Sequence, residues 1–254
     1  MTKAQTGKAP ASALPSLFVT GTDTGVGKTV LSALLGLIYQ SAGLKVAYLK
    51  PVETGATKGA GGLIPEDTKF VADVLGLKES FDVLCPYSFE HPVSPHLAAR
   101  LEKKEFKPQV AQECFKYLQK FYDAVIVEGA GGFLVPLSER YMVADLARDL
   151  GLPLVITARP GLGSINHSLL TIAAAVQVEL KVAGVVINRY PENPDPVAGD
   201  NPRTIAKFSG LPVLARVPEI AGLDAKEPAR ALLEKAALEL NQAYRLGETL
   251  AKLA

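Results

Sequence analysis

Six short apolar runs divide the 254-residue chain, and the segments between them are loops or are long enough for helices. The runs are 17–20, 45–49, 124–128, 154–158, 182–188 and 213–215. They read as nearly continuous Val, Ile and Leu, which is typical of parallel strands covered on both faces. The alternation predicts an α/β fold, a parallel sheet of the P-loop NTPase kind with helices on both faces. Ligands of such sheets bind beyond the carboxyl ends of the strands.

A glycine-rich loop follows the first run, in the sequence FVTGTDTGVGKTVLSALL at residues 18–35. A strand that stops at such a loop and restarts as a helix presents unpaired backbone N–H groups, which bind an anion. Lys28 adds a charge suited to phosphates, and the Thr29 hydroxyl can bind magnesium. The usual spacing G-x-x-x-x-G-K-[ST] is not met, because Thr22 replaces the first glycine and Gly21 stands one place early. The sequence predicts a variant phosphate-binding loop, with a chance Gly-Lys-Thr turn as the alternative.

The composition of the chain indicates which binding partners and which cellular compartment to expect. The chain has 27 Lys and Arg against 26 Asp and Glu, so no overall field attracts nucleic acid or an anionic membrane. No apolar run approaches the roughly 20 residues that span a bilayer. Cys85 and Cys114 lack C-x-x-C spacing, which favours reduced thiols in the cytoplasm. We expect a disordered leader at 1–15, and one P-loop α/β domain at 16–254 whose helical tail, from Glu227, packs on the body.

Charged side chains end two further runs. Lys50 follows the second run and precedes a proline, and Glu128 follows the third run and precedes the glycines of VEGAGG. Glu128 stands where an acidic strand end holds magnesium beside a phosphate loop. On local evidence alone, Lys50 could be a solvated strand end and Glu128 could simply begin a loop.

Other polar residues allow more than one interpretation. Asp67 stands where a helix begins, in GLIPEDTKFVADVLG, so it could cap that helix. Asn188 ends the run VAGVVIN, where its amide could pair with an adenine edge or form a turn. His91, His96 and His167 show no metal-ligand spacing, and we expect structural or hydrogen-bonding roles for them.

Five segments in order resemble the dethiobiotin synthetase family: VTGTDTGVGKT, KPVETG, PVSPHLAAR, VEGAGGFLVPL and GSINHSLLT. The resemblance covers about residues 17–220, and it accounts for the variant loop, because G-T-x-T-x-V-G-K-T is that family's own pattern. It implies a cytoplasmic, ATP-dependent ligase of biotin biosynthesis. Such a ligase converts 7,8-diaminopelargonate, CO2 and ATP into dethiobiotin, ADP and phosphate, through a carbamate and a carbamic-phosphoric anhydride.

The resemblance also implies roles for individual residues. Three catalytic residues would surround the transferred phosphate: Thr24, Lys28 and Lys50. Three would hold Mg2+: Thr29, Asp67 and Glu128. The nucleotide would contact Thr24, Gly25, Val26, Gly27, Lys28, Thr29 and Val30, with its base at Asn188 and Pro218. The diamine would contact Lys50, Thr54, Ser94, Pro95, Gly131, Leu162 and Asn166, the last two from the partner subunit of a homodimer. Alternatively, Asn166 would only cap its own helix.

Two other classes of protein share parts of this pattern. An ATP-dependent amide-forming synthetase acting on a larger carboxylate usually carries a glutamine-hydrolysing domain, for which we expect no room in 254 residues. A partner-regulating ATPase of the MinD or ParA kind carries a signature lysine four residues before the last loop glycine. This chain has Asp23 there, a residue of opposite charge. The ligase is therefore the favoured interpretation.

Overall fold

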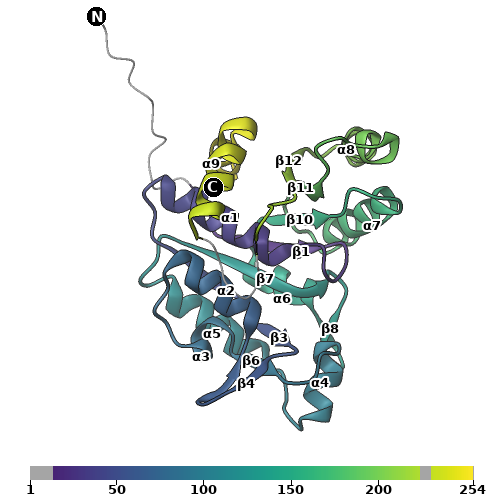
Figure 1. Ribbon diagram of the computed structural model, residues 1–254. Coiled ribbons are helices and arrows are strands. Elements are labelled where there is room, and N and C mark those ends of the chain that lie inside the picture. Colours follow the sequence, from purple (N-terminus) through teal and green to yellow (C-terminus); the bar gives the residue numbers. More distant parts are fainter. Residues whose placement is uncertain (1–13, 224–229, 254) are drawn as a thin grey trace, which may run out of the picture.

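The computed structural model describes residues 14–223 and 230–253. Its centre is a six-stranded parallel sheet with the strand order β12-β11-β10-β1-β7-β2 (Figure 1). The strands are β1 (Leu17–Gly21), β2 (Val46–Leu49), β7 (Ala124–Gly132), β10 (Leu154–Ala158), β11 (Val182–Tyr190) and β12 (Val213–Pro218). Each predicted run is one of these strands, so the expected parallel sheet is confirmed. β7 continues four residues past its predicted end, since Gly132 still pairs with Gly21 beyond an irregularity in the register.

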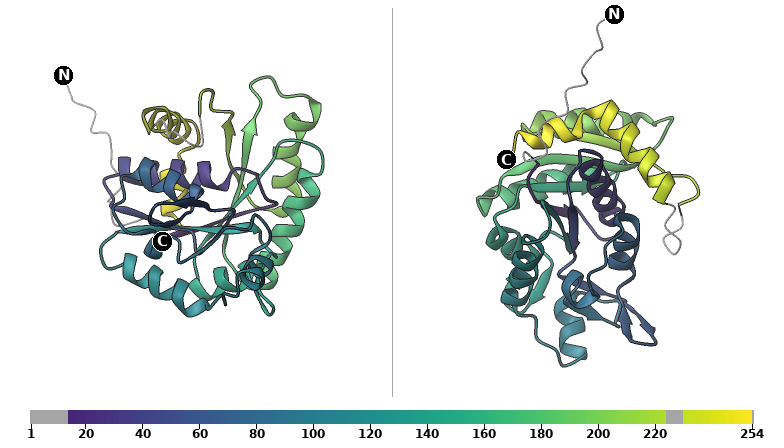
Figure 2. Two further views of the ribbon diagram at one scale, coloured as in Figure 1. Left: turned by 60° about the horizontal axis from the view of Figure 1, so that its bottom comes forward. Right: turned by 90° about the vertical axis from the view of Figure 1, so that its left-hand side faces the viewer.

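Helices cover both faces of the sheet, as predicted (Figure 2). One face carries α1 (Lys28–Ser41), α2 (Glu66–Leu75), α9 (Arg230–Tyr244) and α10 (Leu246–Ala251). The core on the other face includes residues of α3 (Phe81–Leu84), α4 (Pro95–Leu101), α5 (Pro108–Leu118), α6 (Val143–Leu150), α7 (Ser164–Gln177) and α8 (Pro196–Ser209). Along β1, Phe18 belongs to this second core while Leu17 and Val19 belong to the first. Both faces are apolar, which explains why the strands show no polar alternation.

Three two-stranded ribbons lie outside the main sheet. β3 (Val52–Thr54) pairs in parallel with β6 (Tyr87–Phe89). The other two are antiparallel: β4 (Thr57–Gly59) with β5 (Gly62–Ile64), and β8 (Pro136–Ser138) with β9 (Tyr141–Met142). β3 begins two residues after Lys50, so it continues the chain from the carboxyl edge of β2 toward α2.

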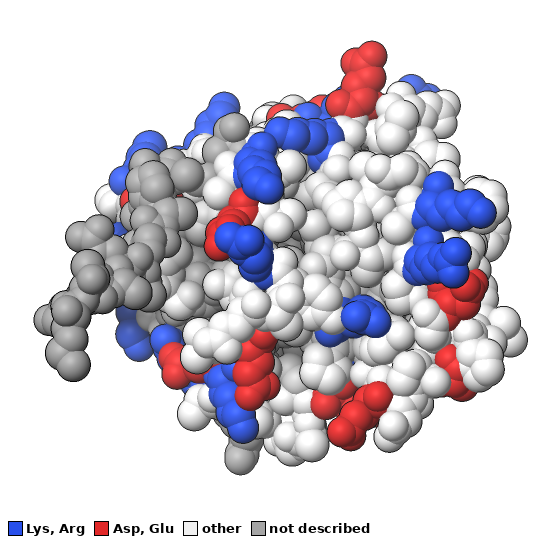
Figure 3. Space-filling view, turned by 90° about the horizontal axis from the view of Figure 1, so that it is seen from above, with Lys and Arg blue, Asp and Glu red and all other residues white. Residues whose placement is uncertain are grey.

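Charges of both signs are mixed on the surface. On the face drawn in Figure 3, Lys and Arg side chains lie among Asp and Glu side chains, in line with the balanced composition. Among the described helices, none has the length and apolar character needed to cross a bilayer.

The two ends of the chain are described in part. Residues 1–13 of the predicted leader lie outside the described residues, as does Glu227, where the tail was predicted to begin. Pro15 is described, and its carbonyl accepts a hydrogen bond of 3.0 Å from the Tyr39 hydroxyl. The described part of the tail is α9 followed by α10, and both pack on α1, where Leu233 and Leu250 are fully buried.

We predict that the tail contributes to the stability of the whole domain. Leu233→Ala should lower the free energy of unfolding by about 2–5 kcal/mol, because it leaves a cavity against α1. Leu238 lies on the same helix with 54% of its surface exposed, so Leu238→Ala should change that free energy by less than about 0.5 kcal/mol. Denaturant unfolding of both variants checks this, and equal effects would show that α9 does not pack on the body as described.

Candidate active site

Polar groups from several strands meet at the carboxyl edge of the sheet. The glycine loop follows β1, Lys50 follows β2, Glu128 lies on β7, Asn188 lies on β11 and Pro218 ends β12. All of these residues, together with loop residues, line one cavity of about 470 Å³. Residues far apart in the sequence are therefore neighbours at one site, at the edge where parallel sheets bind their ligands.

The glycine loop takes a conformation that depends on two of its glycines. Gly25 and Gly27 have φ angles of 70° and 92°. A Cβ atom on Gly27 would lie 1.7 Å from Nδ2 of Asn188, and that Nδ2 donates to the carbonyl of Val26 at 3.0 Å. Gly27 is also the N-cap of α1 and has no side chain with which to cap the first N–H groups of that helix. Such N–H groups suit an anion, in agreement with a phosphate-binding loop.

Lys28 is the first residue of α1 and is buried in the same region. Its Nζ donates to the carbonyl of Asp23 at 3.2 Å, so the side chain folds back under the loop. Burial lowers the pKa of Lys28, and the negative charge of Glu128 opposes this effect.

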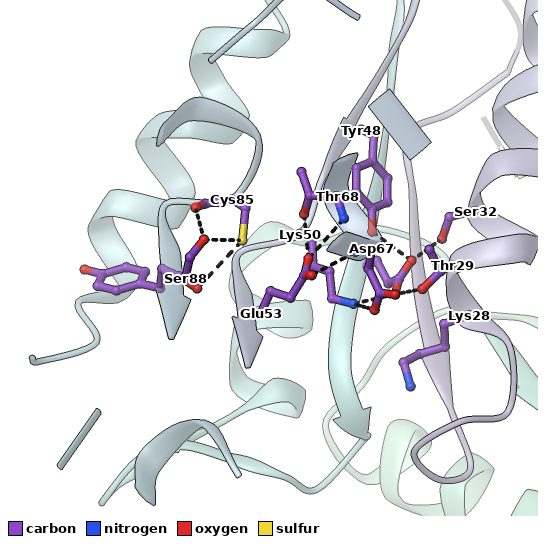
Figure 4. A network of polar contacts seen from close by, with 12 residues as sticks. Lys28, Thr29, Ser32, Tyr48, Lys50, Glu53, Asp67, Thr68, Cys85 and Ser88 are labelled. Atoms are coloured by element: carbon purple, nitrogen blue, oxygen red, sulfur yellow. Dashed lines mark hydrogen bonds and ion pairs between the residues drawn. The ribbon is translucent and has the colours of Figure 1, made fainter. Parts of the chain in front are cut away.

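Lys50 lies between two carboxylates (Figure 4). Its Nζ pairs with Asp67 and, at 3.1 Å, with Oε1 of Glu128. Burial disfavours the charged form of Lys50, but Glu128 and Asp67 outweigh burial and hold the pKa of Lys50 above its ordinary value. Burial tends to raise the pKa of Asp67 as well, and the adjacent Lys50 outweighs it, so that the pKa of Asp67 is lowered. Lys50 and Asp67 thus stabilise each other in their charged forms.

Glu128 is fully buried and is fixed by three hydroxyl groups as well as by Lys50. Thr29 donates to its Oε1 at 2.9 Å. Ser32 and Tyr48 donate to its Oε2 at 2.8 and 2.9 Å. Helix α1 and strand β2 therefore both hold the carboxylate that β7 carries, and its orientation is set by the core of the domain.

The same cluster offers oxygen ligands for a divalent cation. Mg2+ binds through one or two carboxylates and retains other sites for water and phosphate oxygens. Asp67 and Glu128 already share one positively charged group, Lys50 Nζ, and the Thr29 hydroxyl adjoins Glu128. Among the described residues, no group of three or more His, Cys, Asp and Glu side chains surrounds a common point. The donor set therefore fits Mg2+ bound jointly with phosphate rather than a metal held by protein alone.

Most of the residues singled out in the sequence line the cavity: Thr24, Gly25, Gly27, Lys28, Thr29, Val30, Lys50, Thr54, Asp67, Glu128, Gly131, Asn188 and Pro218. The side chain of Val26 is buried beneath the loop, next to Gly21. Ser94 and Pro95 lie at the start of α4 and are not among the lining residues. Leu162 and Asn166, which were expected to act on a partner's site, are exposed and also lie outside the lining.

Two helix-capping interpretations are wrong. Helix α2 begins at Glu66 after an extended Pro65, so Asp67 is its second residue and turns its side chain to Lys50. Helix α7 begins at Ser164 with Gly163 as its N-cap. Asn166 lies inside the first turn of α7 and does not cap it.

Further residues line the cavity that the sequence did not single out: Val52, Glu53, Glu66, Phe70, Ala130, Arg189, Glu219, Ile220 and Leu223. Glu53 is the most deeply placed carboxylate of this group, with 5% of its surface exposed. The only signal for it was its place in KPVETG, three residues after Lys50. Arg189 directly follows Asn188 and has a positive φ of 52°, which no sequence pattern indicates.

Comparisons with known proteins show the family to which the chain is similar. A family described as AAA domain matches residues 15–227. A protein of Clostridium kluyveri named ATP-dependent dethiobiotin synthetase BioD is 38% identical over 83% of this chain and 88% of its own length. A protein of the same name from Anaeromyxobacter sp. is 42% identical over 80% of this chain and 89% of its own length.

Solved structures share the fold at lower identity. A ParA family ATPase from Chlorobium tepidum is 18% identical, with a TM-score of 0.51 over 94% of this chain and 98% of its own. A chain of the MinC:MinD cell division complex from Aquifex aeolicus is 17% identical, with a TM-score of 0.52 over 93% of each chain. These likenesses confirm the P-loop α/β fold and say nothing about activity.

We predict that Gly25 and Gly27 differ in their tolerance of a side chain. Gly25→Ala should cost about 1–2 kcal/mol of stability, because it strains a left-handed backbone at a place where nothing lies within 4 Å of the new atom. Gly27→Ala adds a clash with Asn188 and should weaken ATP binding by a further factor of about ten or more. In an Asn188→Ala background the extra cost should shrink. Calorimetric titration with ATP and denaturant unfolding check this, and equal behaviour of the two alanine variants would contradict the described loop.

Proposed function

The chain belongs to the ATP-dependent dethiobiotin synthetase family, and we propose from this premise that it closes the ureido ring of dethiobiotin, using 7,8-diaminopelargonate, CO2 and ATP. The observation that carries the proposal is the meeting of Lys28, Lys50 and two carboxylates beside one phosphate-binding loop. This arrangement supplies positive charge and positioning, and the proposed reaction requires both.

The first step is attack of an amine on CO2. An aliphatic amine titrates near pH 10, so only about one part in a thousand is neutral and reactive at pH 7. The ammonium group of Lys50, together with bound Mg2+, would disfavour the charged form of the diamine and lower its pKa. The new C–N bond gives a carbamate, and the amine proton passes to solvent. Lys50 also stabilises the carbamate anion.

The second step is attack of a carbamate oxygen on the γ-phosphate of ATP, which breaks the bond to the β-phosphate oxygen and releases ADP. Phosphoryl transfer depends mainly on positioning and charge neutralisation. Lys28, Thr24 and the N–H groups of the loop would hold the transferred group. The neutral second amine then attacks the carbamoyl carbon of the anhydride, phosphate leaves with the C–O bond electrons, the amine proton passes to solvent, and the ring closes. No step needs a nucleophile from the protein.

Magnesium is part of the proposal, with Thr29, Asp67 and Glu128 as the residues that would hold it. When bound, Mg2+ would neutralise charge on the nucleotide phosphates. The lowered pKa of Asp67 keeps that carboxylate ionised well below neutral pH, as a hard cation requires. At the other end of the nucleotide, Asn188 uses one N–H for Val26. Its second N–H and its carbonyl oxygen suit an adenine edge, beside Pro218.

We propose a homodimer formed through α7 and α8. These helices lie side by side (Figure 2). Their side chains Leu170, Val176 and Phe208 are 61%, 60% and 68% exposed. Leu162, at 89% exposed, precedes them. Large exposed apolar side chains on two adjacent helices support an interaction surface there. Leu162 and Asn166 lie outside the cavity of their own chain, so a partner could bring them to the diamine. The long aliphatic diamine would gain contact area by being enclosed between two subunits.

The direct test is an assay of purified protein with ATP, magnesium, bicarbonate and diaminopelargonate. Release of ADP should require both the diamine and the source of CO2, and dethiobiotin should be detected by mass spectrometry. Lys28→Ala removes a positioned charge and should lower the rate by about 10² or more. Vigorous ATP hydrolysis without the diamine would instead indicate a regulatory ATPase, and a Lys28→Ala rate within about twofold of wild type would remove Lys28 from the site.

The shared site is tested by mixing two inactive variants. Asn166→Ala and Lys50→Ala should each be nearly inactive, because every site in either homodimer lacks one residue. A mixed dimer would contain one intact site and one doubly damaged site, so activity should return toward half of the wild-type rate per mixed dimer after subunit exchange. Native mass spectrometry confirms the exchange. No recovery after proven exchange, or full activity of Asn166→Ala alone, contradicts the shared site.

A further inference from the structure

Helix α2 begins without a cap of its own. Its N-cap residue is Pro65, and no side-chain hydrogen bond from that position reaches the helix. The first N–H groups of a helix need acceptors from elsewhere when the helix end is buried. Pro65 and Thr68 are both buried, whereas Glu66 is exposed, so one side of this end of α2 faces the protein interior.

Glu53 supplies the missing acceptors from a different part of the chain. Its Oε1 accepts from the backbone N–H of Asp67 at 2.8 Å. Its Oε2 accepts from the backbone N–H of Thr68 at 3.0 Å and from the Thr68 hydroxyl at 2.9 Å. Both carboxylate oxygens are therefore used in capping α2. A negative charge at a helix N-terminus also interacts favourably with the helix dipole.

These contacts bind Asp67 to the strand segment at two points. The backbone N–H of Asp67 donates to Glu53 on β3, and its side chain pairs with Lys50, which lies three residues before Glu53 (Figure 4). Thr68 adds two more hydrogen bonds to the same carboxylate. The direction of the Asp67 side chain is thereby set relative to β2 and β3, which carry Lys50 and Thr54 into the cavity.

We propose that Glu53 is a positioning residue for the reaction: by capping α2 from β3, it fixes the Asp67 carboxylate where it can share a divalent cation with Glu128. This inference rests on the proposed function, because it takes Asp67 as a ligand of Mg2+. It assigns Glu53 no contact with the reacting atoms. Groups that orient a metal ligand from behind typically account for a factor of about 10 to 100 in metal affinity.

The variant that tests this is Glu53→Gln, which keeps the shape of the side chain. The amide oxygen of glutamine can accept a hydrogen bond from one of the two backbone N–H groups, but its NH2 group faces the other and cannot accept from it. The substitution also removes the negative charge. Amide exchange followed by mass spectrometry over residues 66–69 should become about fivefold faster, as expected for the loss of a cap. The Mg2+ concentration that half-saturates binding of a non-hydrolysable ATP analogue should rise about tenfold, while binding of the analogue without metal should not change.

A matched control is available in Glu102. Its Oε1 also accepts from two backbone N–H groups, those of Glu90 at 2.8 Å and His91 at 3.2 Å, and it does not line the cavity. Glu102→Gln should leave both the exchange of residues 66–69 and the Mg2+ requirement unchanged. This variant measures the effect on the fold of losing a carboxylate that accepts two backbone N–H groups away from the cavity.

Two results would overturn the proposal: unchanged exchange at the start of α2, or faster exchange with an unaltered Mg2+ requirement, which would make Glu53 a structural cap only. Neither readout needs turnover. If the wild-type protein bound the analogue but formed no dethiobiotin, the proposed function would fail, and the role of Glu53 would still be decided by exchange and by metal-dependent binding.

Discussion

The fully buried carboxylate of Glu128 is the constraint around which the centre of the protein is arranged. A buried charge is costly unless it is paired and hydrogen-bonded. Glu128 has four partners from two neighbouring parts of the chain. Thr29 and Ser32 belong to α1, Tyr48 belongs to β2, and Lys50 directly follows β2. Because each of them must reach the same two oxygens, the register of β2 against β7 and the position of α1 above them are mutually fixed. Removing one charged partner of such a buried pair typically costs about 3–5 kcal/mol, so the site and the fold are stabilised by the same contacts.

The balance of charge around Glu128 also bears on the chemistry. Two lysines, Lys28 and Lys50, face three carboxylates, Glu53, Asp67 and Glu128. With all five ionised, the cluster has an excess of one negative charge before any phosphate arrives. A polyphosphate would add several more, opposed by the loop N–H groups, the two lysines and Arg189, which also lines the cavity. A divalent cation beside the carboxylates reverses this balance, which is a physical reason for the proposed Mg2+ that does not depend on the resemblance to other proteins.

The sequence predicted what depends on local pattern, and it missed what depends on the meeting of distant segments. The six strands and the loop were readable because continuous apolar runs and the Gly27–Thr29 segment carry their own signals. The alternative that Asp67 caps its helix is wrong, because the acceptor for the first N–H groups of that helix is Glu53, fourteen residues earlier. The close approach of Asn188 to Gly27 spans most of the domain, so no local pattern indicates it. The three small ribbons are two or three residues per strand, too short for any periodicity.

Asp23 distinguishes the glycine loop of this chain from the pattern of MinD- and ParA-type ATPases. In the regulatory ATPases the corresponding position carries a signature lysine, a charge that can act on phosphate. Here the Asp23 carboxylate accepts from the N–H of Thr24 at 2.7 Å and from Arg159 at 3.0 Å, and Arg159 also donates to the Thr24 carbonyl at 2.9 Å. The side chain is therefore engaged within its own chain, and its charge would repel a phosphate. The contacts of Asp23 and Arg159 therefore hold the loop around Thr24, and the positive charge in the cavity comes from Lys28, Lys50 and Arg189. This distribution is consistent with the proposed reaction, in which an anionic carbamate would lie beside ATP.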